Sequence, residues 1–484
     1  MKFIDRIAAR AAADPDGTAV LDGDGPGALS YAELWEESGR TAARLAEAGA
    51  GPGSRVALAS GRGAGHVVGA LAAWRTGGAV VPLDPGAAPP RRAQVLRAAN
   101  PAATVRDDGT VETHGGPGPD GTAPLGLERS ADDGYYVFTS GSTGRPKGIA
   151  MPRSALDNLV AWQLPEIGAR PRRRVAWFAP VAFDVSLQEI TCTLASGGTL
   201  TVVPDEIRAS PAALLAWLVE YRVEVLHLPY VALQMLAVQA ATSPLTARLR
   251  LTEVITAGEV LKCTPDIIGM FLRLPGARLT NQYGPSETHA VTRYALPGDP
   301  ALWPGLPPLG TAVPGVRVTL RDAAGAEVAP GEQGELCVEG IVLRGYVGED
   351  AAEANARALG EGYYRTGDFA SERAGLLRFA GRKDQQVKID GHRVELGGVE
   401  SVLVSHPKVE EAVCLVTGRD SLERTLVAVV VGSAGQAELR SFLGARLHPS
   451  MVPSRFVTTA SLPLTSTGKA DRLAAERLLG HGRA

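Results

Sequence analysis

The stretch from Tyr136 to Gly148 holds the residues best suited to chemistry, and it reads Tyr-Val-Phe-Thr-Ser-Gly-Ser-Thr-Gly-Arg-Pro-Lys-Gly. The aromatic and β-branched residues at its start predict a strand, and the glycines and hydroxyl residues after them predict a loop. Glycines let backbone N–H groups approach an anion closely, hydroxyls add donors, and Lys147 adds a positive charge. The stretch is therefore predicted to bind phosphate.

Two other interpretations of this loop are less well supported. It is not the phosphate loop of the P-loop NTPases, because Gly148 rather than Ser or Thr follows Lys147 and the glycine-to-lysine spacing differs. A flexible Gly/Ser linker is the second alternative. The strand-like residues before the loop and the lysine after it disfavour a linker.

Residues 139–148 resemble the signature loop of the adenylate-forming enzymes. That superfamily includes acyl-CoA synthetases, luciferases and the adenylation domains of nonribosomal peptide synthetases. The resemblance covers nearly the whole chain, because further family motifs follow in the same order: Phe183-Asp-Val-Ser186, Asn281-Gln-Tyr-Gly-Pro-Ser-Glu287, Tyr364-Arg-Thr-Gly-Asp368 and Gly468-Lys-Ala-Asp-Arg472. We therefore expect a free-standing adenylation enzyme or one excised from a larger synthetase, and the starting Met1 favours the former.

The resemblance implies a site for ATP and Mg²⁺. In it Tyr283 would stack on adenine, Asp368 would accept the ribose hydroxyls, and Glu287 would bind the magnesium ion. Taken alone, Tyr-Gly-Pro and Gly-Asp are ordinary turn sequences, so these roles depend on the resemblance. The full set of nucleotide-binding residues that it implies is Thr139, Ser140, Gly141, Ser142, Thr143, Gly144, Lys147, Gly258, Glu259, Asn281, Tyr283, Gly284, Asp368 and Arg382.

Lys469 would be the catalytic lysine by the same resemblance, although a lone lysine in a glycine-flanked loop is more often plain surface. A carboxylate would attack the α-phosphorus of MgATP, release pyrophosphate and form an acyl adenylate, while Lys469 neutralises charge between the two anions. Asp384 would be a hinge. Rotation about it would then admit the phosphopantetheine thiol of a carrier protein supplied in trans.

Asp184 indicates which carboxylic acid is activated. A buried ammonium group needs a counter-charge, and in the family motif this aspartate pairs with the amino group of an amino acid. The implied substrate pocket consists of Asp184, Val185, Gln188, His227, Ile255, Ala257, Gln282, Ala290 and Val291. It has no second carboxylate, which disfavours lysine, ornithine and arginine. The pattern favours a proline-like, polar cyclic or β-amino acid. For His227, a core histidine with satisfied hydrogen bonds is the open alternative.

Three other functions remain open. An acyl-CoA or aryl-CoA ligase, or a ligase that loads D-alanine on a carrier protein, would share the fold and the first step. An inactive relative would only bind nucleotide or a carrier protein. Asp184 disfavours the CoA ligases, and the presence of Lys147, Glu287, Asp368 and Lys469 disfavours an inactive protein. An MbtH-like activator protein is an open partner.

Length and composition indicate the number of domains and limit the kinds of partner and the cellular compartment. A chain of 484 residues exceeds one hydrophobic core, so we expect an N-terminal adenylation core over 1–383 and a C-terminal lid domain over 384–484. The net charge of −3 and the lack of long basic runs disfavour nucleic acid and membrane partners. The scattered cysteines predict buried thiols, and the N-terminus lacks a signal peptide, so a soluble cytoplasmic protein is expected. Arg172-Arg-Arg174 is predicted to be a solvated surface.

The elements that must position these residues follow an α/β pattern. Strand-like and helical stretches alternate at 56–60, 66–75 and 78–83, which predicts a parallel sheet covered on both faces. Ser30 and Glu33 form a capping-box pattern at the start of a helix. The stretch 100–134 is expected to be loop with one hairpin. The predicted fold is a large N-terminal domain of packed αβ sheets plus a distorted barrel, followed by a small mobile α+β lid.

Overall fold

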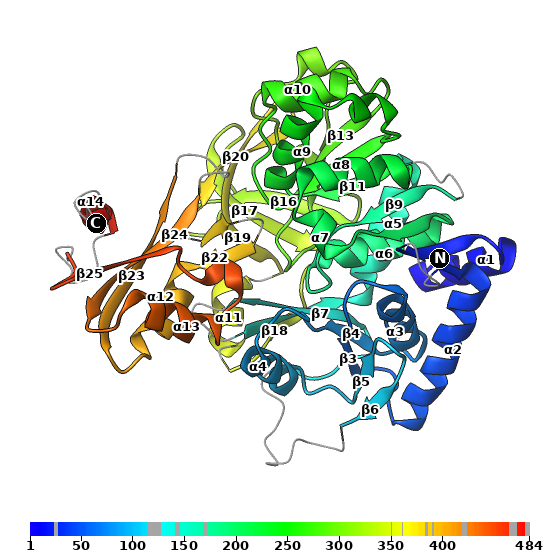
Figure 1. Cartoon of the computed structure of the whole chain (residues 1–484), viewed down its shortest axis with the longest axis horizontal. Helices are drawn as coiled ribbons and strands as arrows, with labels where there is room; N and C mark the ends of the chain where they lie inside the picture. Colours follow the sequence, from blue (N-terminus) through cyan, green and yellow to red (C-terminus); the bar gives the residue numbers. More distant parts are fainter. Residues whose placement is uncertain are drawn as a thin grey trace. The chain divides into compact units, whose positions relative to one another are not determined.

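We describe a computed structural model of the chain (Figure 1). It describes residues 1–23, 28–114, 127–140, 146–167, 172–349, 351–360, 362–382, 386–389, 392–418, 424–463 and 472–479. The chain divides into two compact units. The first comprises Met1–Pro85, Ala99–Val137 and Ile149–Lys383, and the second comprises Gly86–Ala98, Phe138–Gly148 and Asp384–Ala484.

The larger of the two main sheets of the first unit has nine strands. Their spatial order is β15 (Thr311–Ala312), β14 (Thr292–Ala295), β13 (Arg278–Tyr283), β12 (Glu253–Ala257), β11 (Val225–Leu228), β9 (Arg174–Trp177), β10 (Thr199–Val202), β1 (Thr18–Asp22) and β2 (Leu29–Ser30). All pairs from β13 to β1 are parallel. Parallel strands place their carboxyl ends at one edge of the sheet, which is where ligands bind in open α/β sheets.

A second sheet has seven strands. Their order is β18 (Gly345–Val347), β8 (Pro146–Pro152), β7 (Asp133–Ser140), β4 (Ala79–Pro82), β3 (Arg55–Ala59), β5 (Ala103–Arg106) and β6 (Val111–Thr113). Strands β3 and β4 are parallel and joined by α3 (Ala64–Arg75), as the alternating pattern predicts. Strands β5 and β6 form the expected hairpin.

A group of helices shares one hydrophobic core with both sheets: α1 (Phe3–Ala13), α2 (Tyr31–Glu47), α3, α5 (Arg153–Ile167) and α6 (Asp184–Ser196). Helix α6 is buried on nearly all sides, because it lies against sheet residues and other helices at once. The predicted capping box is present at the start of α2. There the Ser30 hydroxyl accepts the Glu33 N–H, and the Glu33 carboxylate accepts the Ser30 N–H.

The opposite face of the nine-stranded sheet carries a separate core with α7 (Asp205–Arg208), α8 (Pro211–Glu220), α9 (Tyr230–Thr242), α10 (Pro265–Leu272) and the short 3₁₀ helix η1 (Pro244–Arg248). A second 3₁₀ helix, η2 (Pro300–Leu302), directly precedes Trp303 of this core. Figure 1 shows α8, α9 and α10 gathered beside β11 and β13. In β9, Ala176 belongs to this core and Trp177 to the core on the other face. The alternation follows from the two-residue period of a strand.

The first unit ends in an antiparallel sheet of four strands, β16 (Val316–Arg321), β17 (Gln333–Gly340), β19 (Tyr364–Arg373) and β20 (Leu376–Arg382), with α11 (Ala351–Ala358) between β18 and β19 in the chain. These strands form a sheet separate from the nine-stranded and seven-stranded sheets.

The second unit is a small α+β structure. In chain order it contains α4 (Pro89–Ala99, except its last residue), β21 (Gln386–Ile389), β22 (His392–Glu395), α12 (Leu396–Val404), β23 (Val409–Thr417), β24 (Thr425–Gly432), α13 (Gln436–Gly444), η3 (Pro449–Met451), β25 (Arg455–Thr459) and α14 (Arg472–Leu479). Residues on alternate positions of β23 and β24 belong to two separate cores. Both faces of the β23, β24 and β25 sheet are therefore covered.

Two expectations about polar and reactive side chains have different outcomes. The four cysteines are buried free thiols, as predicted. The prediction of a solvated arginine run is wrong at Arg173, which is only 6% exposed and donates to the Thr252 hydroxyl. Arg173 directly precedes β9, a central strand of the nine-stranded sheet, so the neighbouring elements cover its side chain.

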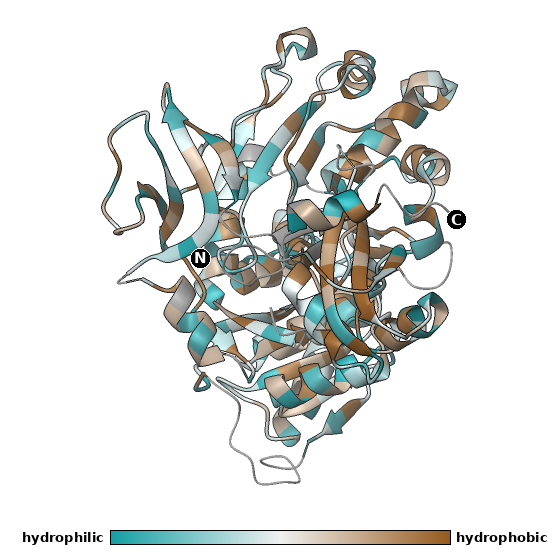
Figure 2. Cartoon of the chain, turned by 90° about the vertical axis from the view of Figure 1, so that its left-hand side faces the viewer, coloured by the Kyte–Doolittle hydropathy of each residue, from teal (hydrophilic) through white to brown (hydrophobic). Residues whose placement is uncertain are grey.

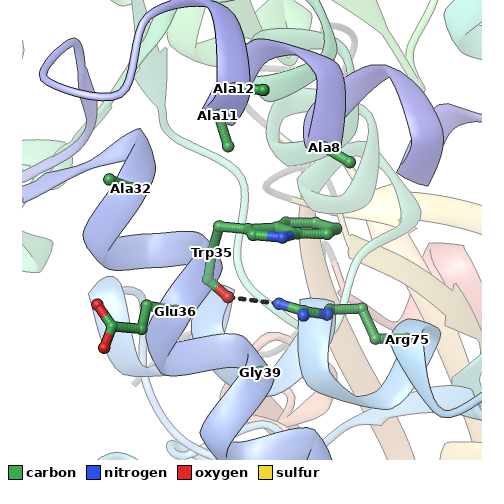
Figure 3. Close-up of a pocket in the computed structure, with 8 residues that line it drawn as sticks. All are labelled: Ala8, Ala11, Ala12, Ala32, Trp35, Glu36, Gly39 and Arg75. Atoms are coloured by element: carbon green, nitrogen blue, oxygen red, sulfur yellow. Dashed lines mark hydrogen bonds between the residues drawn. The ribbon is translucent and has the colours of Figure 1, made fainter.

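The surface helices show alternating hydrophilic and hydrophobic residues along their length (Figure 2). Within the described part of the chain, no helix is both long enough and apolar enough to cross a membrane. A depression of about 500 Å³ lies between α1 and α2, where the Arg75 guanidinium stacks 3.9 Å from the ring centre of Trp35 (Figure 3). None of the predicted site residues lines it.

Candidate functional site

Strand register brings predicted pocket residues to one face of the nine-stranded sheet. His227 of β11 pairs with Ile255 of β12, and Ala257 of β12 pairs with Gln282 of β13. Paired residues in parallel strands point to the same face, and so do residues two apart in one strand. His227, Ile255, Ala257 and Gln282 therefore project from the same face near the carboxyl ends of their strands.

Helices α5 and α6 cover this face. Gln188 of α6 donates from its side-chain nitrogen to the side-chain oxygens of Gln282 and Gln163, each at 3.0 Å. Gln163 of α5 also accepts a hydrogen bond from the Cys192 thiol, with 3.0 Å between Sγ and Oε1. Sequence reasoning missed Gln163. The available signal was a glutamine between Trp162 and Leu164 in a helix that is otherwise largely apolar on that side.

Asp184 is the first residue of α6 and is 8% exposed. Its Oδ1 accepts the Val185 N–H at 2.9 Å, and its place in the first helical turn stabilises a negative charge. Burial raises the pKa of Tyr135, and the charge of Asp184 raises it further. Burial lowers the pKa of His289, and the same charge opposes that change. Asp184 is thus electrostatically coupled to two residues that were not predicted.

Tyr135 and His289 are joined to each other by a hydrogen bond of 2.8 Å between the phenol oxygen and Nδ1. Both side chains are buried. Because burial lowers the pKa of His289, its ring is neutral at pH 7, so one ring nitrogen carries a hydrogen and the other is a hydrogen-bond acceptor. The pair extends the polar surroundings of Asp184.

His227 does not have the hydrogen bonds of a satisfied core histidine. Neither of its ring nitrogens has a hydrogen-bond partner among the described residues. The carboxyl group of Glu189 lies nearby, with 4.0 Å between its Oε1 and Nδ1 of His227. Burial lowers the pKa of His227 to about 4, so the ring is neutral at pH 7.

Glu189 has a positioning role that the sequence did not reveal. Its carboxyl oxygens accept the backbone N–H groups of Phe178 and Ala179 at 3.1 and 3.0 Å. This fixes the loop that leads from β9 to Asp184. Burial raises the pKa of Glu189 to about 8.

A second group brings together three residues of the predicted nucleotide site. The Tyr283 hydroxyl donates to Asp368 Oδ2 at 2.6 Å, and Arg382 Nη1 lies 2.6 Å from Oδ1 of the same carboxylate. Asp368 in β19 and Arg382 in β20 are register partners, and the Thr366 hydroxyl accepts the Asp368 N–H. The Tyr283 ring and the Asp368 carboxylate are therefore held side by side.

The turn from β13 to β14 carries Glu287. A Cβ on Gly284 would lie 1.5 Å from the carbonyl oxygen of His289, so only glycine fits there. The Tyr283 carbonyl accepts the Val291 N–H at 2.8 Å, which closes the turn. Glu287 is fully buried and accepts a hydrogen bond of 2.9 Å from the Tyr346 hydroxyl.

Other predicted residues lie in varied surroundings. Asn281 donates its side-chain amide to the Pro308 carbonyl, and Glu259 accepts the Val231 N–H. Gly258 has a φ of 91°, which suits the sharp end of β12. Val291 packs in the apolar core of the four-stranded sheet, apart from the group around His227. Val185 and Ala290 are half-buried.

Several predicted residues lie outside the described part of the chain. These are Gly141, Ser142, Thr143, Gly144, Asp384 and Lys469, and nothing is described of the Ser140 side chain. Thr139 and Lys147 flank the loop in β7 and β8. The Thr139 hydroxyl is buried and has no partner among the described residues. An unpaired buried hydroxyl is suited to bind a phosphate oxygen.

The described residues contain no group of three or more His, Cys, Asp or Glu side chains that could hold a metal ion. Magnesium does not need such a group, because it is commonly held by one or two carboxylates together with substrate phosphates and water. The buried, hydrogen-bonded Glu287 fits that kind of site.

Comparison with protein families identifies the chain. The family described as AMP-binding enzyme matches residues 7–347, and AMP-binding enzyme C-terminal domain matches residues 398–469. This chain belongs to the AMP-binding enzyme family. The predicted membership of the adenylate-forming superfamily is thereby confirmed. The motifs at 139–148, 183–186 and 281–287 lie inside the first matched range, the motif at 364–368 lies between the two ranges, and Lys469 is the last residue of the second.

The chain is similar to parts of curated peptide synthetases. Tyrocidine synthase 2 of Brevibacillus parabrevis is 34% identical over 487 residues, which cover 95% of this chain and 13% of that protein. Phosphinothricin tripeptide synthetase PhsB of Streptomyces viridochromogenes is 35% identical over 502 residues, which cover 97% of this chain and 41% of that protein. The chain spans less than half the length of either relative.

Similar solved structures confirm the fold class. The amide bond synthetase McbA from Marinactinospora thermotolerans has a TM-score of 0.83 and 26% identity, with 99% of each chain covered. The crystal structure of IdnL1 has a TM-score of 0.79 and 28% identity, covering 95% of this chain and 98% of the other. The mixed α/β fold with a large N-terminal and a small C-terminal part is therefore shown.

Proposed function

We propose that this protein activates an amino acid as aminoacyl-AMP and then transfers it to the phosphopantetheine thiol of a carrier protein. Asp184 is the observation that carries the amino-acid assignment. A carboxylate at the buried start of α6 is available to pair with an ammonium group, beside a pocket face formed otherwise by neutral side chains. The similarity to peptide synthetases supports the same assignment.

In the first step, a carboxylate oxygen of the amino acid attacks the α-phosphorus of ATP. The bond from that phosphorus to pyrophosphate breaks, and aminoacyl-AMP is left. The group formed by Tyr283, Asp368 and Arg382 would hold adenosine. Glu287 would hold Mg²⁺, which neutralises phosphate charge, and Lys469 would bridge the reacting anions.

In the second step, the carrier thiol loses its proton, its sulfur attacks the acyl carbon, and AMP leaves. Asp384 would be the hinge for the change between the two steps. The pocket favours an uncharged side chain. The candidate substrates are a proline-like, polar cyclic or β-amino acid, because Gln188, His227 and Gln282 offer neutral polar groups while the aliphatic Ile255 and Ala257 line the rest.

Amino-acid-dependent exchange of pyrophosphate into ATP tests the first step. The purified chain is assayed with the proteinogenic amino acids, proline analogues, β-amino acids, aryl acids and fatty acids. We expect exchange with one or a few amino acids and none with acids that lack an amino group. Exchange driven best by aryl or fatty acids would replace the proposal with a CoA ligase.

The acceptor is tested separately, because the similarity to an amide bond synthetase over 99% of both chains makes an amine the specific second candidate. The adenylate formed in place is offered a phosphopantetheinylated carrier protein, coenzyme A or a primary amine. We expect product only with the carrier protein. Amide formation without a carrier would favour the second candidate.

A further inference from the structure

A cavity of about 270 Å³ lies between α5 and strands β12, β13 and β14. Its lining includes Gln163, Ile255 and Gln282, two of which belong to the predicted amino-acid pocket. Arg278 and Arg293 line it as well. The cavity is therefore a polar space that adjoins the predicted pocket from the side of α5.

The boundary between the two spaces consists of three side-chain amides. Gln188 binds Gln163 and Gln282 through one nitrogen, at 3.0 Å each. The exposed fractions are 1% for Gln163, 2% for Gln188 and 4% for Gln282. Gln163 and Gln282 line the cavity, and Gln188 is a predicted pocket residue. The three amides thus span from the pocket to the cavity.

Stability alone does not account for this arrangement. The Gln163 oxygen accepts from both Gln188 and Cys192, while its side-chain nitrogen has no partner among the described residues. A buried donor without a partner costs about 1–3 kcal/mol. Because of that cost, the feature to explain is the position of the Gln163 side chain, where the cavity meets Gln188 and Gln282 of the predicted pocket.

We propose that Gln163 is a specificity-determining residue, whose side chain closes the amino-acid pocket against the cavity and limits the length of side chain that the pocket accepts. This inference rests on the proposed amino-acid activation. By this inference Gln163 of α5 forms the end of the pocket, in addition to the pocket residues at the strand ends and in α6.

Truncation of Gln163 tests the boundary. In Gln163→Ala the pocket and the cavity join, and we expect kcat/KM for amino acids with side chains longer by two or three non-hydrogen atoms to rise at least about tenfold relative to the preferred substrate. The rise should come from a lower KM. In Gln163→Leu the bulk remains, so the ranking of substrates by length should stay that of the wild type.

Exchange is measured with a series of unbranched amino acids of increasing length, and thermal melting and ATP binding confirm that each variant is folded. If Gln163→Ala does not fold, Gln163→Asn shortens the side chain by one methylene and serves the same comparison. The inference would be overturned if folded Gln163→Ala ranked amino acids by length as the wild type does. It would also be overturned if Gln163→Leu accepted longer amino acids to the same extent as Gln163→Ala. Absence of amino-acid-dependent exchange in the wild type would instead contradict the proposed function.

Discussion

At the level of single residues, charge placement decides what the pocket can bind. Asp184 is buried at the start of a helix, His227 is neutral, and the amides of Gln188 and Gln282 bind each other. A carboxylate in these surroundings is best satisfied by one cation. The ammonium group of the substrate supplies that cation in our proposal, and the rest of the substrate is expected to be uncharged.

The first prediction concerns Asp184→Asn. Removing one partner of a buried ion pair costs about 3 kcal/mol or more, which corresponds to at least about 100-fold in kcat/KM for the amino acid. Pyrophosphate exchange measures the loss. ATP binding and the melting temperature should stay close to the wild type, because among the described residues Asp184 interacts with Val185, Tyr135 and His289, which are not predicted to bind nucleotide. A variant that keeps full activity would remove the ammonium role from Asp184.

The second prediction concerns the pH dependence of stability through His227. Its pKa in the folded protein is about 4, below the ordinary value of 6.5, so the unfolded chain takes up the proton first as the pH falls. The wild type should therefore lose stability between pH 6.5 and pH 4 relative to His227→Leu. Inside this window, the difference in unfolding free energy between the two proteins should change by up to about 1.4 kcal/mol for each pH unit.

The measurement is denaturant unfolding of both proteins at a series of pH values. Titrating groups distant from His227 are common to both chains and cancel in the difference, and the neighbouring Glu189 has a pKa of about 8, above this window. Parallel stability curves for the two proteins would show that His227 does not have a lowered pKa in the folded state.

At the level of elements, the β13 to β14 turn links the two halves of the site. Strand β13 carries Gln282 toward the substrate face and ends at Tyr283, which binds Asp368. The turn then places Glu287 under the Tyr346 hydroxyl. A change in the turn should therefore affect nucleotide binding before it affects the amino-acid pocket.

The third prediction concerns Gly284→Ala. The added methyl group would lie 1.5 Å from the His289 carbonyl oxygen, so the turn must open. We expect a loss of about 2 kcal/mol or more in stability and weaker ATP binding. The matched control is Gly298→Ala in the loop after β14, where a Cβ meets nothing within 4 Å. Calorimetry measures the stability and the ATP binding of both variants. Equal stability and equal ATP binding in the two variants would show that the turn tolerates opening.

At the level of the whole molecule, the proposed chemistry needs residues of both units. The substrate face, the Tyr283 group and Glu287 belong to the first unit, and Lys469 belongs to the second. Such a division allows one enzyme to use different residues of the second unit in its two steps.

The fourth prediction concerns Lys469→Ala. We expect pyrophosphate exchange to fall at least about 100-fold, because the charge that develops between carboxylate and phosphate loses its neutralising group. Folding should be unaffected. The control is Lys408→Ala in the same unit, which removes an exposed lysine paired with Glu438 and should leave exchange unchanged. Normal exchange by Lys469→Ala would refute its catalytic role.

The sequence by itself determined the superfamily, the order of its motifs and several helices and strands, because these depend on local residue types and their spacing. The Ser30 capping box, the parallel β3 and β4, and the buried cysteines are examples. Only the tertiary structure decided which distant side chains meet. Gln163, Glu189 and His289 act through partners far away in the chain, and Arg173 is buried because neighbouring elements cover the start of β9. Such contacts depend on strand order and helix packing, which no local pattern encodes.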